Sequence, residues 1–80
     1  MKASGINNAE LVIEANENKA GDYEAALKVA EKMVEIAKGY NWVVAIASAE
    51  EGQWVHVCAD WQHKQASNMR ELYNDAKGAA

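Results

Sequence analysis

The sequence contains no proline, no phenylalanine and only one cysteine, Cys58. A single cysteine cannot form a disulfide within the chain, so we expect a reducing, cytoplasmic setting in which crosslinks add nothing to stability. The longest run of apolar residues, 42–47, is far shorter than the roughly 20 residues that a membrane-spanning helix needs. Residues 1–8 also lack the apolar stretch of a secretory signal. We therefore expect no association with a membrane.

The chain has no long segment of one charge. Residues 1–40 hold seven acids and five bases, and residues 41–80 hold five acids and three bases, so each half carries a net charge of −2. This even acidity argues against nucleic acid as a partner, because such partners require a basic surface. Glycine-rich phosphate loops and Cys-x-x-Cys or His-Glu-x-x-His motifs are absent too. We expect no cofactor.

Large apolar residues are few for a chain that must fold without crosslinks. Half of the 80 residues are hydrophobic, but sixteen of those forty are alanine. A chain of this length buries only roughly 60% of the surface that its unfolded form exposes. We expect one domain spanning residues 1–80, in which residues 1–8 form a flexible or extended arm. A core this thin leaves little room for an enclosed active site.

Two segments have the pattern of amphipathic helices. Residues 22–38 are rich in helix formers, with Asp22 as the expected N-cap and Gly39 as the expected stop. The apolar residues of this segment form two adjoining stripes, which indicates a well-buried helix. We expect the second helix at roughly residues 62–77. Its apolar stripe consists of Ala66, Met69, Leu72, Tyr73 and Ala76.

Residues 41–60 have the pattern of a β-hairpin. The segment 41–49 is rich in β-branched and aromatic residues, and 50–52 ends in a glycine suited to positive φ. Residues 53–60 then alternate strictly. One side of this strand carries Val55, Val57, Ala59 and Trp61, and the other side carries Trp54, His56, Cys58 and Asp60.

Residues 10–16 are compatible with two structures. They could form a strand with Leu11, Ile13 and Ala15 facing inward, or a helix capped by Asn7 with Glu10 three residues later. We favour the strand, since a third strand would stabilise the hairpin. The predicted fold is therefore α+β, a two-layer β-α-β-β-α sandwich with a three-stranded sheet and two helices on one face. The alternative is α-α-β-β-α with a single hairpin.

The alternative has one supporting resemblance. Residues 21–27, Gly-Asp-Tyr-Glu-Ala-Ala-Leu, resemble the inter-helix turn and second helix of a tetratricopeptide repeat. That family's first-helix signature is not matched, because its positions are taken by Glu10, Ile13, Glu14 and Glu17. A stable array also needs at least about three units. We infer no function from this resemblance.

We expect the functional surface to be the sheet face that bears Trp54, His56, Cys58 and Asp60. Its neighbours depend on the hairpin register, because a one-residue slip turns a strand over. A two-residue turn would place Val43, Ala45, Ala47 and Ala49 beside them. A three-residue turn would place Trp42, Val44, Ile46 and Ser48 there instead. Both registers predict an unusually apolar open face, and such a face often marks a binding site. We interpret Trp42 and Trp61 as core anchors.

The same strand also offers reactive side chains. His56, Cys58 and Asp60, followed by His63, include the ligand types that zinc prefers. However, His56 and Asp60 lie roughly 13 Å apart along a strand, too far for one ion. A Cys58–His56 nucleophile pair is conceivable, but no third orienting group or oxyanion loop is evident. We therefore expect no catalytic and no metal-binding residues.

We expect the chain to bind another protein, as a non-catalytic inhibitor or adaptor. The expected contact residues are Trp54, His56, Cys58 and Asp60. Inhibitors of this size without crosslinks or cofactors occur in phages and mobile elements, and the uncharged segment 42–49 could pair with a second copy to form a homodimer. Two alternatives are a metal- or thiol-dependent enzyme or sensor using His56, Cys58 and His63, and a single-stranded nucleic-acid binder using Trp54.

Overall fold

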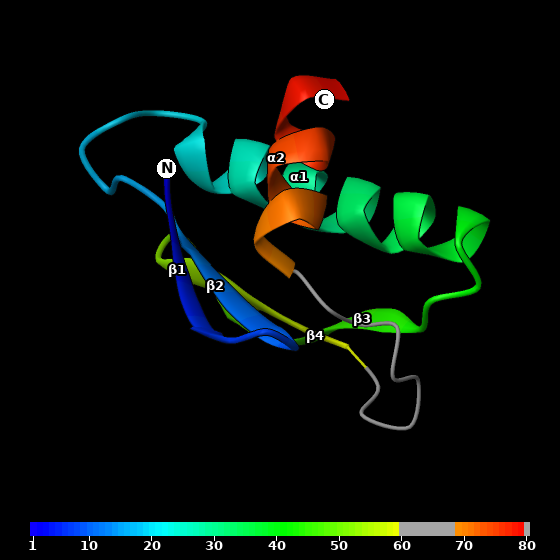
Figure 1. The fold of residues 1–80 in the computed structure, drawn as a ribbon. Coiled ribbons are helices and arrows are strands. Elements are labelled where there is room, and N and C mark those ends of the chain that lie inside the picture. Colours follow the sequence, from blue (N-terminus) through cyan, green and yellow to red (C-terminus); the bar gives the residue numbers. More distant parts are fainter. Residues whose placement is uncertain (60–68, 80) are drawn as a thin grey trace.

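The computed structural model describes residues 1–59 and 69–79 (Figure 1). These residues form an antiparallel sheet of four strands in the order β1-β2-β4-β3, with both helices on one of its faces. The α+β class and the two layers are as predicted, but the sheet has four strands instead of three. The elements are β1 (Lys2–Asn7), β2 (Glu10–Glu14), α1 (Asp22–Gly39), β3 (Val44–Glu50), β4 (Trp54–Ala59) and α2 (Met69–Ala79).

The additional strand is β1, which lies within the segment expected to be an arm. It pairs with β2 from Lys2 opposite Glu14 to Asn7 opposite Glu10. A tight turn joins the two strands, and the Asn7 side chain stabilises it by accepting a hydrogen bond from the Ala9 N–H at 2.8 Å. Asparagine favours such turns because its side chain can mimic the backbone. The alternative arrangement with a helix at residues 10–16 is wrong, so no helix lies where the first helix of a tetratricopeptide repeat would be.

Strand β2 shows the alternation that the sequence predicts. Leu11 and Ile13 are fully buried, and Ala15, just beyond the strand, is half-buried. The intervening residue Val12 is half-buried on the other face, and Glu14 is exposed. Since β2 lies between β1 and β4, it pairs with one strand that directly precedes it in the sequence and with one about 40 residues after it.

Helix α1 starts at Asp22 as expected, but Asp22 is not its N-cap. The cap is Gly21, whose φ of 83° is a left-handed conformation that glycine adopts readily. The buried Asp22 carboxylate instead accepts the Asn16 N–H at 2.6 Å and lies 2.7 Å from the amino-terminal ammonium. It therefore ties the preceding loop and the start of β1 to the helix.

The end of α1 lies beyond the predicted stop. Gly39 is still helical, and the left-handed residue is Asn41, with a φ of 56°. The Trp42 N–H donates to the Ala37 carbonyl at 2.9 Å, and the Asn41 N–H donates to the Lys38 carbonyl at 3.1 Å. This pair of bonds is a Schellman motif, which satisfies the last helical carbonyls. Trp42 then packs against the core, as predicted for an anchor.

Strands β3 and β4 form the predicted hairpin, with a register that changes along its length. Glu50 lies opposite Trp54, which leaves a three-residue loop with Gly52 at a φ of 79°. Near this loop Ser48 pairs with His56, as the three-residue turn predicts. A bulge between Ile46 and Ser48 then shifts the pairing, and Ala45 pairs with Cys58. Each predicted register is therefore right for only part of the hairpin.

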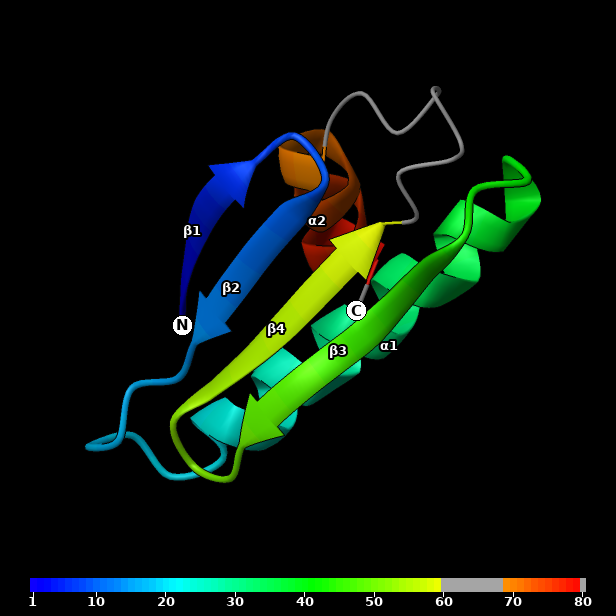
Figure 2. The same cartoon turned by 90° about the horizontal axis from the view of Figure 1, so that it is seen from below.

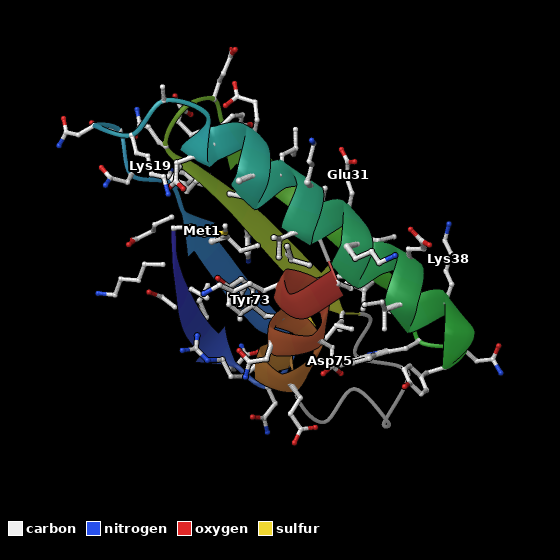
Figure 3. The ribbon with its side chains drawn as sticks, turned by 90° about the horizontal axis from the view of Figure 1, so that it is seen from above. Met1, Lys19, Glu31, Lys38, Tyr73 and Asp75 are labelled. Carbon is white, nitrogen blue, oxygen red and sulfur yellow. The ribbon has the colours of Figure 1, made fainter. Side chains whose placement is uncertain are left out.

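Helix α2 is described from Met69 onward, and its apolar stripe is buried as predicted. Met69, Leu72, Tyr73 and Ala76 are at most 4% exposed. Figure 3, viewed from the helix side, shows Tyr73 of α2 together with the solvent-facing Glu31 and Lys38 of α1. Predicted features at residues 60–68, including Trp61, Ala66 and the helix start, lie outside the described residues.

The core lies between the sheet and the two helices. Its largest fully buried side chains come from the two central strands and from both helices, and they are Leu11, Ile13, Met33, Met69, Val55 and Val57. Ala26, Ala30 and Ala37 of α1 are also fully buried, so small side chains let this helix pack closely on the sheet. Neither described helix is long and apolar enough to cross a membrane.

Candidate functional site

Three of the four predicted contact residues lie on the sheet face opposite the helices. Trp54, His56 and Cys58 alternate along β4 with Val55, Val57 and Ala59, which are buried beneath the helices. Figure 2 shows this face of the sheet in front of both helices. We call it the open face. Asp60, the fourth predicted contact residue, and His63 lie outside the described residues.

The open face is less apolar than the sequence analysis expected. Trp54 lies between Glu14 of β2 and Glu50 of β3, and both glutamates are exposed. His56 has Val12 and Ser48 as its cross-strand neighbours. Across the bulge in β3, the small residues Ser48 and Ala45 lie opposite His56 and Cys58. The described part of this face is therefore more polar than predicted, since Glu10, Glu14 and Glu50 lie on it.

Three large apolar side chains are exposed among the described residues. Ile6 is 58% exposed in the edge strand β1. Tyr40 and Val43 are 69% and 52% exposed in the connection between α1 and β3. None of the three is a cross-strand neighbour of Trp54, which has Glu14 and Glu50 beside it.

A cluster of three side chains occupies the open face where β2 and β4 pair. Glu10 lies directly opposite Cys58, and His56 is two residues before Cys58 on the same side of β4. Glu10 Oε1 is 3.3 Å from His56 Nε2 and 3.4 Å from Cys58 Sγ. His56 Nε2 and Cys58 Sγ are 3.2 Å apart. We call these three residues the Glu-His-Cys cluster.

Asn7 determines how the Glu10 carboxylate is oriented. The Asn7 side-chain nitrogen donates to Glu10 Oε2 at 2.8 Å, which leaves Oε1 directed at His56 and Cys58. The Asn7 side-chain oxygen is itself held by the Ala9 N–H in the β1–β2 turn. Both ends of the Asn7 amide are therefore engaged, and the carboxylate is braced by the turn that precedes it.

The cluster shifts the ionisation of two of its members in opposite directions. The hydrogen bond from Asn7, followed by the contacts with Cys58 and His56, lowers the pKa of Glu10. Burial, followed by the hydrogen bond and charge of Glu10, raises the pKa of the Cys58 thiol. Glu10 is therefore ionised at neutral pH, and Cys58 carries its proton and donates it toward the carboxylate.

This arrangement is poorly suited to nucleophilic catalysis. A cysteine nucleophile needs a lowered thiol pKa, whereas burial and Glu10 raise that of Cys58. In a catalytic triad the acid and the nucleophile contact different ring nitrogens of the histidine. Here Glu10 Oε1 and Cys58 Sγ both contact Nε2 of His56. Glu10 therefore competes with the thiol for Nε2 and does not orient the His56 ring through Nδ1.

Sequence reasoning missed Glu10 as a member of the site. The residue pair Asn7 and Glu10 was interpreted only as a helix-capping pattern, and their side chains do bond to each other, but in a hairpin. The useful signal was the Asn-Asn turn before an alternating segment, which favours a β-hairpin. Nothing in the sequence indicates that β2 pairs with β4 instead of β3, and that pairing alone brings Glu10 to Cys58.

Comparisons with known proteins add no functional information. No protein-family model, curated protein or solved structure matches this chain.

Proposed function

We propose that this protein acts by binding another protein through its open face, as a non-catalytic inhibitor or adaptor. The observation that carries the proposal is the row formed by Glu14, Trp54 and Glu50 across three adjacent strands. A half-buried tryptophan on an open sheet is a suitable interface anchor, because tryptophan is enriched among the residues that dominate binding energy. His56 and Cys58 lie farther along the same strand, and Asp60 follows them in the sequence.

The charges in this row indicate the chemistry of the partner. Two exposed carboxylates flank the Trp54 side chain, so a guanidinium or ammonium group could contact the ring and one carboxylate together. The net charge of −4 favours the approach of a basic surface as well. We therefore propose a partner that presents an arginine or lysine side chain to Trp54.

The same row disfavours the nucleic-acid alternative. A base stacked on Trp54 would bring its phosphates near Glu14 and Glu50, and the like charges would repel. The described part of the open face offers one exposed cation, Lys2 of β1, which lies opposite Glu14 of β2. A basic protein segment is consequently the better match.

A titration with short peptides tests the proposal. We expect an arginine-containing peptide to shift the NMR signals of the Trp54 indole and of the neighbouring strands in a saturable manner. An otherwise identical glutamate-containing peptide should shift none of them. Trp54→Ala should weaken arginine-peptide binding about fivefold, equivalent to a cation–π contribution of roughly 1 kcal/mol, while the melting temperature changes little.

Charge-matched variants separate the site from the overall acidity. Glu14→Gln with Glu50→Gln should weaken binding, whereas Glu17→Gln with Glu31→Gln, which removes the same charge elsewhere, should not. Equal weakening by both pairs would show a nonspecific charge effect. Binding that persists in Trp54→Ala, or a collapse of its fold, would contradict the role of Trp54 as a surface anchor.

A further inference from the structure

We propose that the Glu-His-Cys cluster is a binding site for a divalent transition-metal ion of the zinc type. This inference goes beyond the proposed binding of a protein partner, since it concerns Glu10, His56 and Cys58 and not the row around Trp54. It also differs from the metal alternative in the sequence analysis, which lacked Glu10 and relied on His63.

The spacing of the three ligand atoms matches one face of a tetrahedral site. Zinc bonds of about 2.0–2.3 Å to nitrogen, oxygen and sulfur imply separations of about 3.3–3.6 Å between ligand atoms at tetrahedral angles. The three separations in the cluster are 3.2, 3.3 and 3.4 Å. An ion placed over this triangle would therefore reach all three atoms after movements of a few tenths of an ångström.

The backbone and the residues around the cluster hold it in place. Its three residues lie on β2 and β4, the two central strands, whose pairing sets Glu10 opposite Cys58 and Val12 opposite His56. Asn7 holds the outer oxygen of the carboxylate, as residues around metal sites commonly do. This bond leaves Oε1 as the oxygen available to an ion.

The ligand types select among metals. A thiolate, an imidazole and a carboxylate suit zinc and its neighbours, whereas magnesium and calcium prefer oxygen ligands alone. When the sulfur binds the ion, the Cys58 thiol proton passes to solvent, and the site then holds two negative charges against the 2+ ion. The side chains of His56 and Glu10 are 21% and 27% exposed, so residues 1–59 and 69–79 leave a fourth position for water or for a ligand from a partner.

Cobalt(II) provides a direct optical test on the whole chain. Titration of the reduced protein with Co²⁺ alone should give a saturable signal at one ion per chain, with a thiolate-to-cobalt charge-transfer band and the visible bands of a tetrahedral ion. One equivalent of Zn²⁺ should abolish that signal. The absence of saturable binding of either ion would overturn the proposal.

Variants assign the ligands. Cys58→Ser should remove the charge-transfer band, and Glu10→Gln and His56→Ala should each weaken Zn²⁺ binding by at least about 10-fold. Asn7→Ala should also weaken Zn²⁺ binding, because the Glu10 carboxylate loses the hydrogen bond that orients it. Glu14→Gln, on the same face of β2, is the matched control and should leave affinity unchanged.

The other histidine provides a second control. His63→Ala should bind Zn²⁺ as the unchanged protein does. Binding that depends on His63 but not on Glu10 would overturn the assignment. Circular dichroism of each variant distinguishes a lost ligand from a lost fold. If Glu10→Gln does not fold, Zn²⁺ binding by Asn7→Ala decides whether the Glu10 carboxylate is a ligand.

Discussion

The Asp22 carboxylate is 4% exposed and lies where the loop, the helix and the first strand meet. It accepts the Asn16 N–H and contacts the amino-terminal ammonium, and these two interactions, in that order, lower its pKa. A carboxyl group whose pKa is lower in the folded protein stabilises the fold when it is ionised. Although it was interpreted as a helix cap, Asp22 holds the loop to the helix through a charged side chain.

The lowered pKa of Asp22 predicts a pH dependence of stability. Its contribution should be complete above the pKa of the unfolded state, about 3.9, and should be lost as pH falls through the lower pKa of the folded state. Asp22→Asn should therefore lower the urea midpoint at neutral pH and flatten its decline in acid. Urea unfolding at a series of pH values measures this effect, and Asp75→Asn, at an exposed site on α2, is the control. An equal acid decline in both variants would contradict the prediction.

At the scale of the element, the end of α1 shows which residue stops a helix. Gly39 was the predicted stop, yet it is helical, and Asn41 takes the left-handed conformation two residues later. Glycine is the usual residue at such a position, but asparagine also adopts it. The packing of Trp42 against the core accounts for the end of α1 beyond Gly39. The Schellman motif at the end of the helix places Trp42 directly after the left-handed Asn41, where it contacts the core.

Alanine substitutions at these two positions should have opposite effects. Gly39→Ala should stabilise the protein by about 0.4–1 kcal/mol, because Gly39 is helical and nothing lies within 4 Å of an added Cβ. Asn41→Ala should destabilise it by about 1 kcal/mol, since alanine tolerates the left-handed region poorly. Chemical unfolding of both variants measures the difference. If Gly39→Ala proved the more harmful change, Gly39 would be the true left-handed stop.

The strands show how far an alternating pattern can be interpreted. Alternation alone predicts that Val55 and Val57 are buried and that His56 and Cys58 face the other way, which is confirmed. Burial imposes this result, because a strand under two helices must place its apolar side inward. Alternation does not predict the bulge in β3, since both faces of that edge strand carry small residues that fit either register.

At the scale of the whole molecule, β3 forms one of the two edges of the sheet. The β3 edge has no strand beside it in residues 1–59 and 69–79, and most of its residues are small and exposed. Natural proteins usually protect such an edge with charges, proline or a covering segment. The only charged residue in β3 is Glu50 at its end. This edge supports the proposal that two copies of the chain pair through β3.

A charge placed on this edge tests the dimer. We expect sedimentation equilibrium to show a reversible dimer, and Ala47→Lys to weaken it about fivefold or more, because like charges opposed across strands cost roughly 1 kcal/mol. Ser4→Lys adds the same charge to the opposite edge strand and should leave the dimer unchanged. A monomer at every concentration, or equal effects of the two variants, would contradict pairing through β3.

The sequence by itself determined the α+β class, the two amphipathic helices, the β3–β4 hairpin and the alternation that separates Trp54, His56 and Cys58 from the core. These features depend on residues close in the chain, whose spacing sets which side is apolar. Only the tertiary structure decided that Lys2–Asn7 forms a strand, that β2 inserts beside β4, and that Glu10 therefore meets His56 and Cys58. The Glu10–Cys58 contact joins residues 48 positions apart, and both contacts depend on a strand order and register that no local pattern encodes.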